Sequence, residues 1–259
     1  MATPSNIVLR EQVEGIVHLT LNQPEKRNAL SKPLLEQLHH ELKQIAADAS
    51  ARVVILKANG PVFSAGHDLK EMAASSREAL QCIFDLCAKV METIPNMPQP
   101  VIAQVHALAT AAGCQLVASC DLVVAADCAS FATPGVKVGL FCTTPGIPLS
   151  RAIPAKKALE MLFTGDAITA DEACRIGLVN RVVPLDQLAA ATMALATKIV
   201  NASPRVIAQG KRDFYRLQSL DRSAAYHAAG PIMVEAAASA DCREGIAAFL
   251  GKRAPSWPA

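Results

Sequence analysis

The chain has 259 residues, 51% of them hydrophobic, which suffices for one large domain or two smaller ones. Lys and Arg together number 25 against 23 Asp and Glu, a formal net charge of +2 that gives no indication of a nucleic-acid partner. No uninterrupted apolar run approaches the roughly 18 residues of a membrane span, so we expect no membrane partner.

The cysteines and the N-terminal segment bear on the cellular compartment. Residues 1–15 show neither the apolar core of a secretory signal nor an Arg-rich transit pattern, so we expect a cytoplasmic location. The eight cysteines are scattered, without a CxxC pair or a Cys/His cluster. We therefore expect reduced and mostly buried thiols, and no metal site.

In the first half of the chain, β-rich and helical patterns alternate. Two β-rich runs within 7–21 flank a turn at Glu14 and Gly15 and predict a hairpin. Ser31 is a candidate N-cap for a helix that ends near residue 48. Further strands are predicted at 52–60, 99–107 and 121–127. This alternation favours a parallel sheet in an α/β layout.

After residue 148 the pattern becomes mainly helical, with one short strand predicted at 177–183. Apolar spacing predicts helices at 154–165, 169–177, 184–202, 203–218 and 241–253. The sequence thus predicts a core over residues 1–200, followed by a helical region over residues 201–259.

Two junctions between a strand and a helix, at 60–72 and 106–121, are rich in Gly and Ala. Free backbone N–H groups at a helix start favour developing negative charge, and small residues let a ligand approach the main chain. Two such groups aimed at one point form an oxyanion hole. The same small residues also suit close strand–helix packing, and spacing alone favours that interpretation.

At these junctions the chain resembles the crotonase superfamily, the enoyl-CoA hydratase/isomerase family. The similar segments are VEGIVHLTLNQPEKRNALS, FSAGHDLKEM, AAGCQLVASCDLVVAADCASFATPGVKVGL, ALEMLFTGDAITADEACRIGLVNRVVP and REGIAAFLGKRAPSW. Within the family, GLFCTTPG is similar to the branch of enoyl-CoA hydratase domain-containing proteins. The resemblance implies an α/β fold, a spiral of ββα units with a helical C-terminal trimerisation region, and assembly into a homotrimer or hexamer.

The resemblance also implies an acyl-CoA thioester as ligand, with coenzyme A as part of the substrate and no permanently bound cofactor. The backbone N–H groups of His67 and Ala112 would hold the thioester oxygen, with Gly113 as the adjacent alternative. Phe249 and Lys252 would complete the nucleotide site of a neighbouring subunit. The other residues that match the family's CoA site are Lys26, Arg27, Ala29, Ala65, Asp68 and Leu69.

Two positions depart from the pattern of the family's hydratases. Those enzymes use two glutamates, one as a base toward water and one as an acid toward the α-carbon. The matching positions here hold Gln115 and Gly135. Glutamine can orient a water or bond a carbonyl but has no titrating proton, and glycine offers only its backbone. We therefore expect weak or absent hydration.

Other polar residues near these motifs have competing interpretations. His67 titrates near neutral pH in its unperturbed state, although a role for its N–H alone is slightly favoured. Cys142 and Thr143 are candidates to line the acyl pocket, and Cys142 is expected to pack rather than act as a nucleophile. Asp121 is expected to be a structural turn residue.

Three functions remain open on the sequence. The first is an acyl-CoA enzyme of the hydratase/isomerase type, a lyase or an isomerase, which stabilises a thioester enolate. The second is a decarboxylase or thioester hydrolase on the same scaffold, which needs an oxyanion hole but less acid–base help. The third is a non-catalytic acyl-CoA-binding protein.

Overall fold

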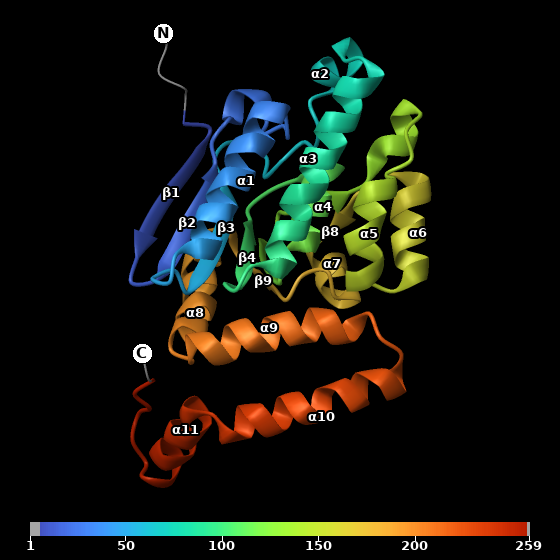
Figure 1. The fold of residues 1–259 in the computed structure, drawn as a ribbon. Helices are drawn as coiled ribbons and strands as arrows, with labels where there is room; N and C mark the ends of the chain where they lie inside the picture. The colour runs from blue at the N-terminus through green and yellow to red at the C-terminus, as the bar shows by residue number, and fades with distance from the viewer. Residues whose placement is uncertain (1–5, 258–259) are drawn as a thin grey trace.

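The computed structural model describes residues 6–257 and contains a six-stranded sheet in the order β1-β2-β3-β4-β6-β9 (Figure 1). The first two strands are antiparallel, and every other neighbouring pair is parallel. The strands from β2 onward therefore end at one edge of the sheet, where loops lead into helices. The strands are β1 (Val8–Val13), β2 (Ile16–Leu21), β3 (Val53–Ala58), β4 (Val101–Val105), β6 (Leu122–Ala126) and β9 (Arg181–Val183).

Helices cover both faces of this sheet (Figure 1). The principal ones are α1 (Lys32–Ala47), α3 (Arg77–Asn96), α4 (Ala112–Ser119) and α8 (Leu188–Val200). The larger apolar cluster joins α1, α3 and α4 to the face of β3 that carries Val54 and Leu56. The smaller cluster joins α8 to the opposite face, with Val53 and Ile55. Burial on both faces explains why β3 reads as a continuous apolar run.

A small second sheet and several short helices connect these layers. The sheet has the order β5-β7-β8, formed by β5 (Ala109–Thr110), β7 (Ser130–Ala132) and β8 (Ile168–Thr169). The short helices are η1 (Pro24–Lys26), α2 (Leu69–Ala74), η2 (Pro134–Val138), α5 (Thr143–Ala152), α6 (Ala155–Thr164), α7 (Ala170–Ile176) and η3 (Leu185–Gln187). Within residues 6–257, no helix is both long and apolar enough to span a bilayer.

The predicted hairpin is confirmed, and Glu14 and Gly15 form its turn with positive φ angles of 50° and 80°. Ser31 occupies the N-cap position of α1, but its side chain makes no capping hydrogen bond. The Glu71 carboxylate of α2 instead accepts the backbone N–H of Lys32, at 3.1 Å. The capping hydrogen bond expected from the Ser31 side chain is thus made by a carboxylate of a neighbouring helix.

The C-terminal part consists of α9 (Pro204–Gln218), α10 (Arg222–Ala238) and α11 (Ala240–Leu250). The sequence analysis predicted α9 and α11 but missed α10, as it also missed α3. α9 is fixed to the core by Lys211, whose Nζ lies 2.7 Å from Asp121 Oδ2 and 2.6 Å from the carbonyl oxygen of Ile94. α10 runs below α9, away from the sheet (Figure 1). The division of the chain at residue 200 falls at the end of α8 and stays a prediction.

Candidate functional site

The two Gly/Ala-rich junctions lie against each other. Ser64 pairs with Ala109 in a parallel bridge, and the Ser64 carbonyl oxygen accepts the N–H of Thr110 at 3.0 Å. A Cβ atom at Gly113 would lie 2.5 Å from the Ser64 carbonyl oxygen, and one at Gly66 would lie 3.0 Å from the nitrogen of Ala112. Glycine at 66 and 113 is therefore what allows the first loop to touch the start of α4.

This contact brings two free N–H groups into one region. Ala112 is the first residue of α4, so its N–H has no acceptor within the helix. Across the described part of the chain, neither this N–H nor that of His67 donates to another backbone group. Ala111 precedes the helix with a φ of 52°, which is costly for a residue with a side chain. Its own N–H bonds the Ala132 carbonyl at 2.9 Å, which fixes the orientation of this turn.

Asn28 organises the first loop, although the sequence analysis did not single it out. Its fully buried side chain accepts the N–H of Gln23 at 2.8 Å and donates to the carbonyls of Asn59 and Val62 at 2.7 and 3.1 Å. Its own carbonyl accepts the hydroxyl of Ser64 at 2.8 Å. Its φ of 48° lies in the left-handed region, which asparagine tolerates better than most residues. The asparagine in this loop was the signal that the sequence offered.

The residues matched to the CoA site fall on two adjoining segments. The Ala65 N–H donates to the Arg27 carbonyl at 3.0 Å, so the segment around 26–29 borders the segment 65–69. Lys26 and Arg27 are exposed, Ala29 is buried, and Leu69 is 59% exposed. Asp68 caps α2, because its Oδ1 accepts the N–H groups of Lys70 and Glu71 at 2.9 and 3.2 Å.

Phe249 and Lys252 are not part of this cluster within one chain. They lie at the end of α11, which occupies the opposite end of the molecule from α2 (Figure 1). Phe249 is 82% exposed. Any contact of these residues with a nucleotide at the first loop therefore requires a neighbouring subunit, as the resemblance implied.

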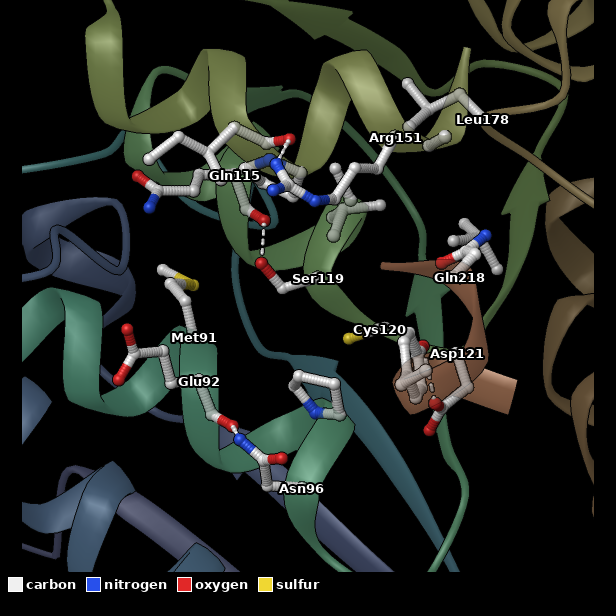
Figure 2. Close-up of a pocket in the computed structure, with 18 of the residues that line it drawn as sticks. Met91, Glu92, Asn96, Gln115, Ser119, Cys120, Asp121, Arg151, Leu178 and Gln218 are labelled. Carbon is white, nitrogen blue, oxygen red and sulfur yellow. Dashed lines mark hydrogen bonds between the residues drawn. The ribbon is translucent and has the colours of Figure 1, made fainter. Parts of the chain in front are cut away.

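Gln115 lies one turn into α4 and lines a cavity of about 840 Å³ between α3, α4, α5 and α9 (Figure 2). Only 4% of the residue is exposed. Its Oε1 is buried and has no hydrogen-bond partner among the described residues. This oxygen is an unpaired acceptor that is closed to solvent, which is costly in free energy.

Gly135 stands where a second acid would be, but the space beside it is closed. A Cβ at this position would lie 2.1 Å from the Leu140 carbonyl oxygen and 2.7 Å from the Cys142 Sγ. Burial raises the pKa of the Cys142 thiol, which disfavours a thiolate. Thr143 begins α5, yet the large cavity is lined by its neighbour Thr144 and not by Gly135, Cys142 or Thr143.

His67 is neutral at physiological pH. Its ring packs edge-on against Phe84, with 5.2 Å between centroids, and its Nε2 is buried without a partner in residues 6–257. Burial lowers its pKa to about 4. A neutral imidazole cannot deliver a proton as readily as an imidazolium, so the side chain is poorly suited to replace a missing acid.

Comparison with known proteins agrees with these features. The profile of the family described as enoyl-CoA hydratase/isomerase matches residues 11–259. The chain belongs to the enoyl-CoA hydratase/isomerase family. The human mitochondrial protein named enoyl-CoA hydratase domain-containing protein 3 is 50% identical over 247 residues, which cover 95% of this chain and 82% of that protein. The 2,3-dehydroadipyl-CoA hydratase of Escherichia coli strain K12 is 35% identical, with 97% of each chain covered.

Solved structures of the family share the fold. The crystal structure of the human domain-containing protein 3 superposes with a TM-score of 0.94 at 49% identity and covers 97% of this chain and 100% of that one. An enoyl-CoA hydratase from Mycobacterium smegmatis also gives 0.94, at 48% identity and with 97% and 98% covered. The fold is therefore the crotonase fold, with its helical C-terminal region present, and the resemblance drawn from the sequence is confirmed.

Proposed function

We propose that the protein is an acyl-CoA enzyme in which the N–H groups of His67 and Ala112 stabilise negative charge on a thioester oxygen, with Gly113 as the adjacent alternative donor. The observation that carries the proposal is the contact of the Gly66 loop with the first residue of α4, together with the two N–H groups that have no backbone acceptor among the described residues. One such donor is typically worth about 3 kcal/mol in the transition state.

Ordinary hydration is disfavoured by the residues at the two acid positions. Relatives are named hydratases, which supports a lyase or isomerase in this family. In this chain, however, Gln115 cannot exchange a proton, and the Leu140 carbonyl and the Cys142 thiol occupy the space beside Gly135. Each missing general acid or base typically costs about 10²–10⁴-fold in rate.

The closed space beside Gly135 favours a second candidate, a decarboxylase or a thioester hydrolase on the same scaffold. Both reactions develop charge on the thioester oxygen, and an oxyanion hole would assist them without the pair of glutamates. A third possibility, a non-catalytic acyl-CoA-binding protein, would use the same backbone contacts for binding alone.

The decisive experiment is a screen of the purified protein against enoyl-, acyl- and carboxyacyl-CoA thioesters, with binding measured by calorimetry and products by mass spectrometry. Exchange of α-protons with deuterated solvent separates an enzyme from a pure binder. Turnover of crotonyl-CoA at ordinary enzyme rates would contradict the account of the acid positions. Absence of binding to every CoA ester would overturn the ligand class.

The variant Gln115→Glu restores one acid without entering the closed space at Gly135. We expect it to raise crotonyl-CoA hydration above that of the wild type, because position 115 lines the cavity. Gln99→Glu is the matched control, since Gln99 is equally buried but bonds the Ile45 carbonyl away from the cavity. Equal hydration rates in the wild type and both variants would show that position 115 does not reach the reacting carbons.

We propose a homotrimer or hexamer as the working assembly. No residue of α10 is buried in the single chain. Even the large side chains of Tyr226, Met233 and Val234 are 77%, 65% and 67% exposed. Exposure of large apolar side chains on one helix supports an interface in which other subunits bury them. Such an assembly is also what would bring Phe249 and Lys252 to a neighbouring nucleotide site.

A cytoplasmic location remains our proposal for this chain. Several relatives carry the word mitochondrial in their names, and that description belongs to those proteins. Fractionation of the native host, with an antibody against the purified protein, tests the location. Recovery of the protein in an organelle fraction would contradict it.

A further inference from the structure

The wall of the large cavity includes an exposed cation, Arg151, that has no carboxylate partner among the described residues. Arg151 lies in the last turn of α5 and lines the cavity that also holds Gln115 (Figure 2). Its Nη1 donates to the carbonyl oxygen of Ile147 at 2.9 Å, as basic residues near helix ends commonly do. Within residues 6–257 the guanidinium has no ion pair, so its Nη2 and Nε donors remain available.

The two acidic residues of the same cavity do not neutralise Arg151. Asp121 is engaged elsewhere, because its Oδ1 accepts the hydroxyl of Tyr215 at 2.8 Å and its Oδ2 accepts Lys211 Nζ at 2.7 Å. Glu92 points away from Arg151 (Figure 2) and also borders a shallower hollow that contains Lys43 and Lys89. The guanidinium is therefore a cation of the cavity wall that has no ion pair within residues 6–257.

An acyl chain that leaves the proposed N–H donors along α4 would enter this cavity, although neither donor lines it. Its wall follows α4 from Gln115 to Cys120, and the proposed thioester donors are at the start of the same helix. At about 1.5 Å per residue, the last residue of α4 is about 10 Å from its first residue. The wall is mixed: Met91, Val117 and Ile147 are apolar, whereas other lining residues are hydroxyls and amides, namely Ser119, Asn180, Gln218 and Ser219. Such a wall suits a chain that is apolar in part and ends in a polar group.

We propose that Arg151 selects acyl chains that carry a second carboxylate, so that the preferred ligands are mono-CoA thioesters of dicarboxylic acids. This inference rests on the proposed function, because it assumes that the thioester lies at the start of α4. A planar guanidinium binds a carboxylate through two parallel hydrogen bonds, which a neutral methyl terminus cannot accept. Arg151 is a specificity residue in this scheme and takes no part in bond breaking.

The test compares chains of equal length with and without the terminal carboxylate, by calorimetry at neutral pH. The pairs are succinyl- against butyryl-CoA, glutaryl- against pentanoyl-CoA, and adipyl- against hexanoyl-CoA. For at least one pair, we expect the carboxylated ester to bind at least about tenfold more tightly than the neutral ester. Arg151→Gln should remove that preference and leave the affinity for the neutral ester nearly unchanged.

Arg216→Gln is the matched control, because Arg216 is also in the last turn of a helix and does not line the cavity. It should keep the preference of the wild type. Equal binding of neutral and carboxylated esters by the wild type would overturn the role of Arg151 while leaving the proposed function intact. A preference that survives in Arg151→Gln would also overturn it. Failure of every CoA ester to bind would instead contradict the proposed function itself.

Discussion

Asn28 shows how one side chain sets the shape of the site. The hydrogen bonds of its side-chain amide join Gln23 to Asn59 and Val62, which lie more than thirty positions further along the chain. The loop that they hold carries Ser64, and Ser64 contacts the start of α4. The positions of the two N–H donors therefore depend on a residue that does not itself face the ligand.

Asn28→Ala should destabilise the protein by about 2–4 kcal/mol, because three backbone groups lose their hydrogen bonds to a fully buried side chain. Asn22→Ala is the control in the same loop, where the side chain is only half-buried, and should cost less than about 1 kcal/mol. Urea unfolding measures both. Equal losses for the two variants would show that the buried amide is not special. Folded Asn28→Ala should also bind CoA esters more weakly.

Gly135→Ala tests whether the second acid position is closed. The added Cβ would meet the Leu140 carbonyl oxygen at 2.1 Å, so we expect a loss of about 1–3 kcal/mol in the free energy of unfolding. Gly210→Ala is the control, because nothing lies within 4 Å of its Cβ position, and helix propensity should make that change neutral or stabilising. If Gly135→Ala proves as stable as Gly210→Ala, the loop at 139–142 yields readily and a carboxylate could be accommodated.

The lowered pKa of His67 predicts that the stability of the protein depends on pH. Burial lowers its folded pKa to about 4 from an unfolded value of 6.5, so between these values the unfolded chain binds the extra proton. Stability should therefore fall as the pH is lowered from about 6.5 to 4, by an amount on the order of 2 kcal/mol. His67→Gln should lose this part of the pH profile in urea unfolding measured across that range. An unchanged profile would mean that the pKa of His67 is the same in the folded and unfolded protein.

At the scale of elements, α9 is attached through a buried cation. Lys211 reaches from α9 to Asp121 and to the carbonyl oxygens of Ile94 and Gln99, at 2.7, 2.6 and 2.8 Å. Burial lowers the pKa of Lys211, and Asp121 opposes that change. Since α9 forms one wall of the cavity, this attachment helps to set the cavity's width.

Lys211→Met should cost about 3–5 kcal/mol, because it leaves the Asp121 carboxylate buried without its cation. Lys198→Met, on the exposed surface of α8, should cost under about 0.5 kcal/mol. The double variant Asp121→Asn with Lys211→Met should recover part of the loss. Thermal unfolding and amide exchange in α9 report the effect. No recovery in the double variant would contradict the charge argument.

Much of the element order was predictable from the sequence, because local patterns determine it. The run at 53–58 reads as a strand buried on both faces, and apolar spacing predicts α9 and α11. The resemblance also located the loops around His67 and Ala112. The carbonyl of Leu140 beside Gly135 and the cavity charge of Arg151 depend on contacts between folded segments. Local sequence patterns do not encode those contacts, so only the structure could reveal them.

At the scale of the whole molecule, α10 is a helix with no buried residue in the single chain. It packs mainly against α9 and α11. Its sequence is rich in small residues and has no apolar stripe of the usual kind, which explains why it was not predicted from the sequence. Its exposed side chains are the basis of the proposed assembly.

Met233→Glu combined with Val234→Glu should dissociate the assembly, because both side chains are mostly exposed on α10 in the single chain. Val13→Glu is the control, an apolar residue of β1 that is 61% exposed. Light scattering after size exclusion should show monomers for the α10 variant and oligomers for the control. Wild-type protein that is monomeric at micromolar concentration would contradict the proposed trimer or hexamer.

The position of α9 between the cavity and α10 links ligand affinity to protein concentration. Phe214, Tyr215 and Gln218 of α9 line the cavity, and α9 packs against α10 on its other side. If subunits join through α10, dilution below the subunit dissociation constant removes the support behind α10, which packs on the helix that shapes the cavity. By mass action, a ligand that prefers the assembled form must then promote assembly by the same factor. The apparent affinity for a CoA ester should accordingly weaken on dilution, and saturating ester should delay subunit dissociation.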